Sequence, residues 1–478
     1  MALLPEYLPV SSPLDPAEEP PGSLDPLGTL GYAERLADAL LPGFTVRMWR
    51  TRLLTFSAVA AAVADRTVTL MGSREELRLE ARLSFERLFV SAVVRMADRD
   101  PTTYATAPRG LPGRDLAKEA LLLADEPLTR ANFLKGQAVN GPFGVIARLA
   151  RHLELIDNDG RMGRNAVALM MAWSDDEHLP GMLDEDSTAT RTGAAWMTDA
   201  VKRTVASVGN RDWPRSSHRI WEQLARHLRP DRIGQKEARV LLQLLEGAVV
   251  RRRVMGLLKK RIDVFRQASD TSERGKVERA VLLRGVRPEL GDDPTDRYID
   301  AVIATVEAYE QTAGMLQQAF DGLVWALKER GGRSRPDVVL EDARLRRHLD
   351  KTLGALSRSS PLLVRATEGL RAQPSIDPTQ FIEPVLRLRD DAVEASASVR
   401  ALADVVLHRH ERVQRVKAKA PWIDRESHWT LMPGENRVGG ESPPVWQDTY
   451  LHPFRIANAY SLLGDLRQVV VKGRDAEE

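Results

Sequence analysis

The chain has 478 residues, of which 43% are hydrophobic, and its 69 basic side chains nearly balance 67 acidic ones for a formal net charge of +2. This length predicts several folding units and this apolar content excludes a disordered protein, while the balanced charge requires any nucleic-acid surface to be a local patch. Cysteine is absent, which excludes disulfides, thiolate nucleophiles and cysteine-ligated metal centres.

The first 28 residues are rich in proline, aspartate and glutamate, so we expect residues 1–28 to form an extended tail outside any core. They lack the basic start and unbroken apolar run of a signal peptide. The longest apolar run, residues 56–64, is shorter than the roughly 20 residues of a membrane span. We therefore expect a soluble protein of the cytoplasm. The preference for arginine and alanine over lysine and isoleucine is typical of GC-rich bacterial genomes.

Helical periodicity begins near Leu30 and dominates the rest of the chain, which predicts a mainly α, multi-domain protein. The first expected domain, residues 29–200, begins with three helices: one that ends before Pro42-Gly43, a strongly apolar one at 51–64, and one at 73–97 with Ser73 as N-cap. Short strand signals occur at 65–71 and 429–432.

The segment at about 116–178 has the clearest functional pattern. It reads as a helix at 126–137, a Gly-Pro turn, a second helix at 141–157 and a short hairpin at 158–165. The second helix has an apolar stripe formed by Ile146, Leu149, Leu153 and Ile156. Its other side and the hairpin carry cations: Arg148, Arg151, His152, Arg161 and Arg164. This is the outline of a winged helix, whose second helix enters the major groove while basic side chains contact phosphates.

Two interpretations of this module stay open. Its apolar stripe explains the helix whatever the function, so the functional hypothesis depends on the cations alone. If the four arginines share one open face, DNA contact gains support. If acidic neighbours pair with them, the module serves folding or protein contacts, as many winged helices do.

A second basic element lies in the expected domain 201–290, where helices are predicted at 216–228 and 235–267. The cations of the longer helix surround an apolar stripe; they are Arg251, Arg252, Arg253, Lys259, Lys260 and Arg261. Such a helix face can be merely solvated, can follow a nucleic-acid backbone, or can dock an acidic protein.

The remaining chain is expected to form a long-helix bundle over 291–420 and a C-terminal loop region with a final helix over 421–478. The bundle begins with a helix of nearly ten turns that ends at Gly331-Gly332. Helices at 338–357, 360–371 and 379–417 follow, and the final helix is predicted at 453–471. Trp422, which follows several basic residues, can either stack on a base or fill a core.

Motifs that carry catalytic chemistry are missing. Residues 272–278 contain Gly-Lys without the other residues of a phosphate-binding loop, and no H-E-x-x-H or G-x-S-x-G occurs. A calcium loop starting at Asp157 would need glutamate where Ala168 stands. His408 and His410 project in different directions from one helix and cannot share a metal. We expect no metal and no cofactor, and favour a non-catalytic protein.

Two short stretches resemble poorly characterised bacterial proteins encoded near antiviral-defence genes. The first holds Leu41-Pro42-Gly43 and Arg52, with Leu53 and Leu54 where an aromatic pair is usual. The second holds Lys419 to Trp422 and the later Phe454-Arg455-Ile456. The resemblance implies a component of a multi-gene defence system and carries over no catalytic residues.

These features predict a non-catalytic helical subunit that binds duplex DNA, bridges protein subunits, or both, within a bacterial antiviral-defence or DNA-handling complex, with no membrane partner. A kleisin-like scaffold for an ATPase complex is one alternative. Another is a metal-dependent nuclease with a dispersed carboxylate site, for which the acidic stretch 174–186 with Asp175 and Asp176 is the candidate.

Overall fold

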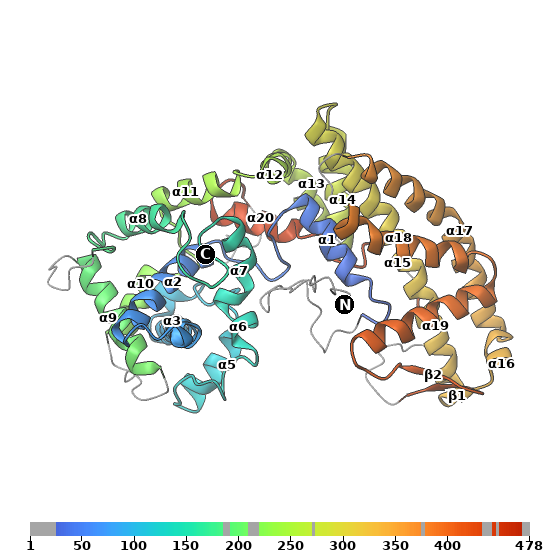
Figure 1. Cartoon of the computed structure of the whole chain (residues 1–478), viewed down its shortest axis with the longest axis horizontal. Coiled ribbons are helices and arrows are strands. Elements are labelled where there is room, and N and C mark those ends of the chain that lie inside the picture. Colours follow the sequence, from blue (N-terminus) through green and yellow to red (C-terminus); the bar gives the residue numbers. More distant parts are fainter. Residues whose placement is uncertain are drawn as a thin grey trace, which may run out of the picture. The chain divides into compact units, whose positions relative to one another are not determined.

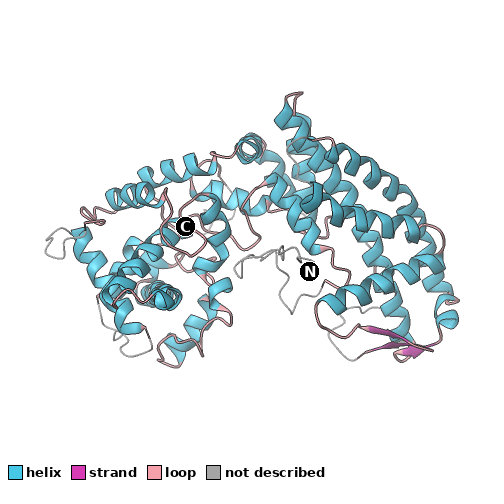
Figure 2. Ribbon diagram, viewed as in Figure 1, coloured by secondary structure: helices cyan, strands magenta, loops and turns pink. Residues whose placement is uncertain are grey.

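The computed structural model describes residues 25–184, 192–208, 219–269, 273–373, 378–432, 442–445 and 449–470. It confirms a mainly α protein (Figures 1 and 2). The chain forms two compact units, each assembled from segments that are distant in sequence. The described parts of unit 1 lie within 41–259 and 457–470, and those of unit 2 within 25–40 and 260–456.

These units differ from the segments expected along the chain, because the first and last helices pack far from their sequence neighbours. The helix Leu30–Leu40 (α1) packs on the long helix Pro294–Glu329 (α15) of unit 2. The helix Ile456–Asp465 (α20) returns to unit 1, where the Asp465 carboxylate accepts a hydrogen bond from the Thr51 N–H at 2.8 Å.

Unit 1 is built around one buried helix. Its elements are α2 (Arg52–Leu70), η1 (Glu75–Leu77), α3 (Arg78–Arg99), α4 (Pro101–Tyr104), α5 (Arg114–Lys118), η2 (Glu119–Leu123), α6 (Gln137–Asn140), α7 (Pro142–His152), α8 (Ala166–Asp176), α9 (Thr192–Ser207), α10 (Ile220–His227), α11 (Gln235–Leu245), α12 (Val249–Lys260) and α20. Helix α2 packs against α3, α7, α8 and α9. Its small and apolar side chains permit this close approach, and Phe56 stacks on Phe89 with ring centroids 4.3 Å apart.

Unit 2 is organised around α15. Its other elements are α1, α13 (Ile262–Ser269), α14 (Arg274–Ala280), η3 (Val281–Val286), η4 (Arg287–Glu289), β1 (Arg333–Ser334), α16 (Pro336–Leu340), α17 (Ala343–Arg371), α18 (Pro378–Ala395), α19 (Val399–Val416), β2 (Ile423–Arg425) and β3 (Trp429–Leu431). Helix α15 packs along α17 and also contacts α18 and α19. The Asp293 carboxylate caps its first turn by accepting the N–H groups of Thr295 and Asp296. The strands form an antiparallel sheet in the order β1-β3-β2.

Of three local expectations, two are wrong and one is confirmed. Residues 65–70 continue α2 and do not form a strand, because the apolar face of α2 stays buried to Val68. The two helices expected at 338–357 and 360–371 are replaced by α16 and a continuous α17. Packing of α17 along α15 outweighs the backbone hydrogen bond that Pro361 removes. The strand at 429–432 is confirmed as β3.

The expected tail is only partly described, since residues 1–24 lie outside the described chain. Residues 25–28, however, belong to the core of unit 2. Leu27 is completely buried, and the His410 ring lies 2.9 Å from the Pro26 carbonyl oxygen. The core of unit 2 therefore begins inside the acidic, proline-rich stretch, at its apolar leucine.

Helix α2 has the length and apolar composition of a membrane span, but 78% of its most apolar window is buried inside the fold. Burial by α3, α7, α8 and α9 accounts for its composition. A core helix of a soluble protein has these properties.

Candidate nucleic-acid interface

The helix and hairpin expected at 141–165 are present. Helix α7 begins with Pro142 after Gly141 and ends at His152. The chain then reverses, and Ile156 pairs with Met162 in an antiparallel bridge. Asp157 N–H donates to the Arg161 carbonyl at 3.0 Å, which closes the hairpin over Gly160. The apolar stripe is also confirmed, because Ile146, Leu149, Leu153 and Ile156 are all at most 2% exposed.

The helix expected at 126–137 is absent. Residues 125–129 have no regular secondary structure, and the Thr129 hydroxyl accepts hydrogen bonds from the N–H groups of Ala131 and Asn132. These local bonds stabilise a turn in competition with a helix. The short helix α6 precedes α7 instead.

The predicted cations of this module occupy different environments. Arg148 and Arg151 are half-buried, whereas His152 is exposed and packs its ring against Gly43. Arg161 and Arg164 are exposed and have acidic neighbours. Arg161 lies 3.2 Å from Glu75, and Arg164 forms an ion pair with Glu154. Exposed ion pairs of this kind contribute only about 0–1 kcal/mol, so these pairs leave both guanidinium groups able to exchange partners.

A cavity of about 550 Å³ lies beside the hairpin and brings Arg161 together with two arginines of α3, Arg78 and Arg82. Three carboxylates also line it, those of Glu75, Glu76 and Asp159. Sequence reasoning missed the two arginines of α3. Arg74, Arg78 and Arg82 recur every four residues, which places them on one face of a helix, and this spacing was the available signal.

The arginines around this cavity influence one another. Burial lowers the pKa of Arg78, and the nearby Arg161 charge lowers it further, although Arg78 also pairs with Glu75 at 2.7 Å. Burial lowers the pKa of Arg82 to about 10; the charge of Glu86 opposes this effect, and the charges of Arg151 and Arg78 add to it. Cations from α3, α7 and the hairpin therefore lie within electrostatic reach of each other.

Glu86 lies beneath the start of α7 and is completely buried. Its carboxylate accepts hydrogen bonds at 2.7 Å from the Phe143 N–H and from the Gln137 side-chain amide. Burial nevertheless raises its pKa from 4.5 to about 7. The carboxyl group is therefore partly protonated near neutral pH.

We expect Glu86 to make unit 1 less stable as the pH rises. The folded state holds a proton on Glu86 between pH 4.5 and about 7, where the unfolded chain has released it. The extra stability is fully present below pH 4.5 and is lost as the pH rises to about 7. The difference between the unfolded and folded pKa values of Glu86 corresponds to about 3 kcal/mol of unfolding free energy. Urea unfolding at pH 5 and pH 8 measures this. Glu86→Gln should show a smaller fall in unfolding free energy between the two values, and equal falls would contradict the assignment.

The predicted basic helix at 235–267 does not form one basic face. It divides into α11, α12 and α13, and the boundary between the two units falls within it. Arg251 is buried, and its guanidinium donates to the carbonyls of Leu244, Leu245 and Pro42, so it closes the end of α11 and cannot reach a ligand. Arg252 is exposed, whereas Arg253 is half-buried.

The last three cations of this set have acidic partners. Lys259 lies 2.8 Å from Glu246, Lys260 forms an ion pair with Glu289, and Arg261 lies 3.1 Å from the same Glu289. This arrangement favours the solvated-face interpretation for that stretch.

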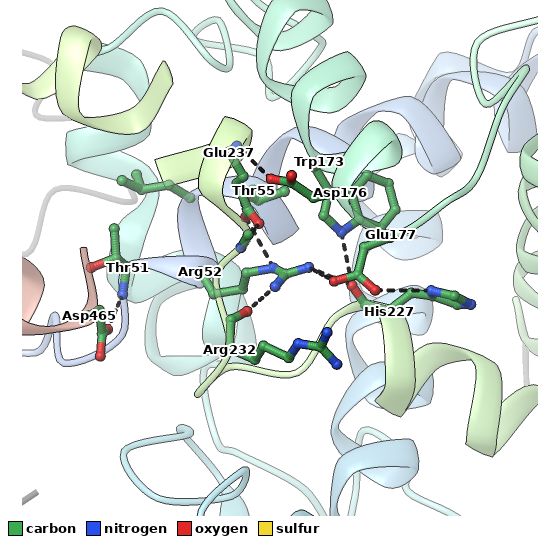
Figure 3. A network of polar contacts seen from close by, with 12 residues as sticks. Thr51, Arg52, Thr55, Trp173, Asp176, Glu177, His227, Arg232, Glu237 and Asp465 are labelled. Carbon is green, nitrogen blue, oxygen red and sulfur yellow. Dashed lines mark hydrogen bonds and ion pairs between the residues drawn. The ribbon is translucent and has the colours of Figure 1, made fainter. Parts of the chain in front are cut away.

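A buried polar network in unit 1 joins α2, α8, α10 and α11 (Figure 3). Arg52 lies 3.0 Å from Glu237 and 2.9 Å from Glu177, and it also donates to the carbonyls of Arg232 and His227. Burial raises the pKa of Glu237. It also disfavours charged Glu177, but hydrogen bonds from His227 and Arg52 hold the pKa of Glu177 below its ordinary value. Arg52 is 1% and Glu237 0% exposed, so substrate cannot reach them, and we assign the network to folding.

The acidic stretch proposed for a nuclease takes part in this framework. The Asp176 carboxylate accepts the Glu237 N–H at 2.8 Å and caps α11, while Asp175 pairs with Lys236 at 2.9 Å. Within the described residues, no group of three or more histidines and carboxylates is arranged to hold a metal ion. Residues 185 and 186 lie outside that part of the chain.

The C-terminal candidate Trp422 lies against the core of unit 2. Its ring centroid lies 5.8 Å from that of Phe320, and its backbone N–H donates to the ring Nε2 of the buried His410 at 2.8 Å. These contacts favour the core interpretation of Trp422. No protein-family model, curated protein or solved structure matches the chain.

Proposed function

We propose that unit 1 binds the phosphate backbone of nucleic acid through the end that carries α7 and the hairpin, as a non-catalytic subunit of a bacterial cytoplasmic complex. One observation carries this proposal: arginines from three separate elements gather around the hairpin. They are Arg78 and Arg82 from α3, Arg151 from α7, and Arg161 from the hairpin itself. Carboxylates lie among these arginines, since Glu75 pairs with both Arg78 and Arg161, so a polyanionic ligand would bind by taking over arginines from exposed ion pairs.

The order of elements supports a winged-helix-like mode of binding. A short helix, a tight turn, a longer helix and a hairpin follow one another over 137–162. In that mode α7 lies at the groove and the hairpin cations contact phosphates. The hairpin tip bears Asp157 and Asp159, both exposed, so phosphates would approach from the arginine side of the hairpin. We therefore expect few phosphate contacts and little sequence preference.

The test is an anisotropy titration of the full-length protein with a labelled duplex at about 50 mM salt. Arg161→Gln combined with Arg164→Gln should weaken binding at least about tenfold, since each substitution removes a charge-assisted hydrogen bond to phosphate. Arg114→Gln is the matched control, because Arg114 is an arginine of the same unit that pairs with Asp115 on α5.

Equal affinities for the wild type and the double variant would place binding elsewhere on the protein. An absence of duplex binding by the wild type would reject the proposal and leave protein bridging as the function of this surface.

A further inference from the structure

Arg82 is a buried cation without a close carboxylate. It is 3% exposed, its Nε has no hydrogen-bond partner, and the charge of Glu86 acts on it without an ion pair between the two side chains. The Phe143 ring lies 4.0 Å from the guanidinium carbon and covers one side. Its neighbour Arg87 differs, since that guanidinium donates to Glu80, Ser84 and Gln137. A buried guanidinium nitrogen without an acceptor is costly, because burial removes the water that would otherwise accept its hydrogen bond.

The surroundings of Arg82 leave space for an acceptor. Arg82 lines the cavity beside the hairpin together with Arg78 and Arg161, which both pair with Glu75, and Glu76 and Asp159 lie at the same cavity. Its Nη1 lies directly under the hairpin, where a Cβ on Gly160 would overlap it. Gly160 also has a φ of +76°, so glycine satisfies both the backbone conformation and the close approach.

We propose that this cavity is a binding site for a phosphate group, with Arg82 as the buried donor and Arg78 and Arg161 at the rim. A guanidinium presents a planar fork of N–H donors that matches two phosphate oxygens. The role of this site in nucleic-acid binding rests on the proposed function, to which it adds a defined pocket for one phosphate group. The phosphate can be the terminal group of a strand or a free anion, and the test separates the two.

The first experiment measures thermal unfolding of the full-length protein in buffers of equal ionic strength, with chloride or with inorganic phosphate. Phosphate should raise the Tm of the wild type and of the Arg114→Gln control by several degrees at saturating concentration. Arg82→Met should abolish this rise. In chloride alone the Tm of Arg82→Met should equal or exceed that of the wild type, because the substitution removes a buried charge that forms no ion pair and a buried nitrogen without an acceptor. If Arg82 had only a structural role, the Tm of Arg82→Met in chloride would be lower than that of the wild type.

Gly160→Ala provides a second variant that keeps the charge. Its methyl group crowds Nη1, so the phosphate response should be lost even if Arg82→Met fails to fold. A wild-type Tm that phosphate does not change, or a response that survives in both variants, would overturn the pocket.

Duplexes with 5′-phosphate or 5′-hydroxyl ends identify the source of the anion. Tighter binding of the phosphorylated duplex that disappears in Arg82→Met indicates a strand end, and equal binding together with an Arg82-dependent phosphate response indicates a free anion. Duplex binding without any phosphate response would reject the pocket alone. An Arg82-dependent phosphate response without duplex binding would reject the proposed function alone.

Discussion

Replacing Arg52 with methionine is expected to lower the free energy of unfolding by about 3–5 kcal/mol. Glu237 would remain fully buried without its countercharge, and removing one partner of a buried ion pair is costly in this way. Urea unfolding monitored by tryptophan fluorescence measures the change. Trp173 is a suitable reporter, because its indole N–H donates to the His227 carbonyl within the network (Figure 3).

A second variant tests the electrostatic cause. Combining Arg52→Met with Glu237→Gln removes both charges and should recover part of the stability that the single variant lacks, because the effects of interacting residues are not additive. A loss of less than about 1 kcal/mol of unfolding free energy in Arg52→Met would contradict this cause. So would a double variant whose loss equals the sum of the losses of Arg52→Met and Glu237→Gln, because additive losses show that the two charges do not stabilise each other.

Replacing Glu310 with alanine is expected to have an effect of similar size in unit 2, again about 3–5 kcal/mol. The Glu310 carboxylate is fully buried and accepts the N–H groups of Leu451 and His452 at 2.5 and 3.0 Å, together with the His452 ring at 2.7 Å. Its removal leaves three buried donors without an acceptor. Hydrogen exchange at Leu451 and His452, alongside urea unfolding, should show that this segment opens first.

The same pair makes the stability of unit 2 depend on pH. Burial disfavours protonated His452, but the charge and hydrogen bond of Glu310 outweigh it and raise the pKa above 6.5. The stabilisation is thus fully present below pH 6.5 and is lost as the pH rises through the folded pKa. Glu310→Gln should lack this dependence while it retains an acceptor oxygen. An unchanged pH profile in Glu310→Gln would assign the dependence to other groups.

Elements with a strong periodic pattern were predictable from sequence. Helix α15 follows from its apolar spacing, the Asp293 cap and the Gly331-Gly332 stop, and the hairpin follows from Asp157 to Gly160. Prediction failed where tertiary packing decided the outcome. Leu27 was assigned to a tail, and a break between two helices was expected between residues 357 and 360, where α17 is continuous.

The candidate site was predictable only in part. The hairpin cations Arg161 and Arg164 are exposed as expected, but the pattern of α7 did not indicate that Arg148 and Arg151 are half-buried. Periodicity can place Arg82 on a helix face, yet only the packing of Phe143 and Gly160 shows that it is buried without an acceptor.

The two stretches that carried the resemblance contain framework residues. Arg52 holds the network of unit 1, and the Pro42 carbonyl accepts from Arg251. In unit 2, Arg455 is buried in ion pairs with Glu34 and Asp38. A similar pattern in another protein would therefore indicate a similar fold before it indicated a shared activity.

The most direct test of nucleic-acid binding by unit 1 is the salt dependence of duplex affinity for the wild type and for the Arg161→Gln/Arg164→Gln variant. Counterion release predicts that log K falls linearly with log salt concentration, with a slope of about −0.9 for each phosphate neutralised. The account predicts a measurable wild-type slope and a variant slope shallower by about 1.8, because the variant neutralises two fewer phosphates. Identical slopes for the two proteins, or no wild-type binding at about 50 mM salt, would contradict it.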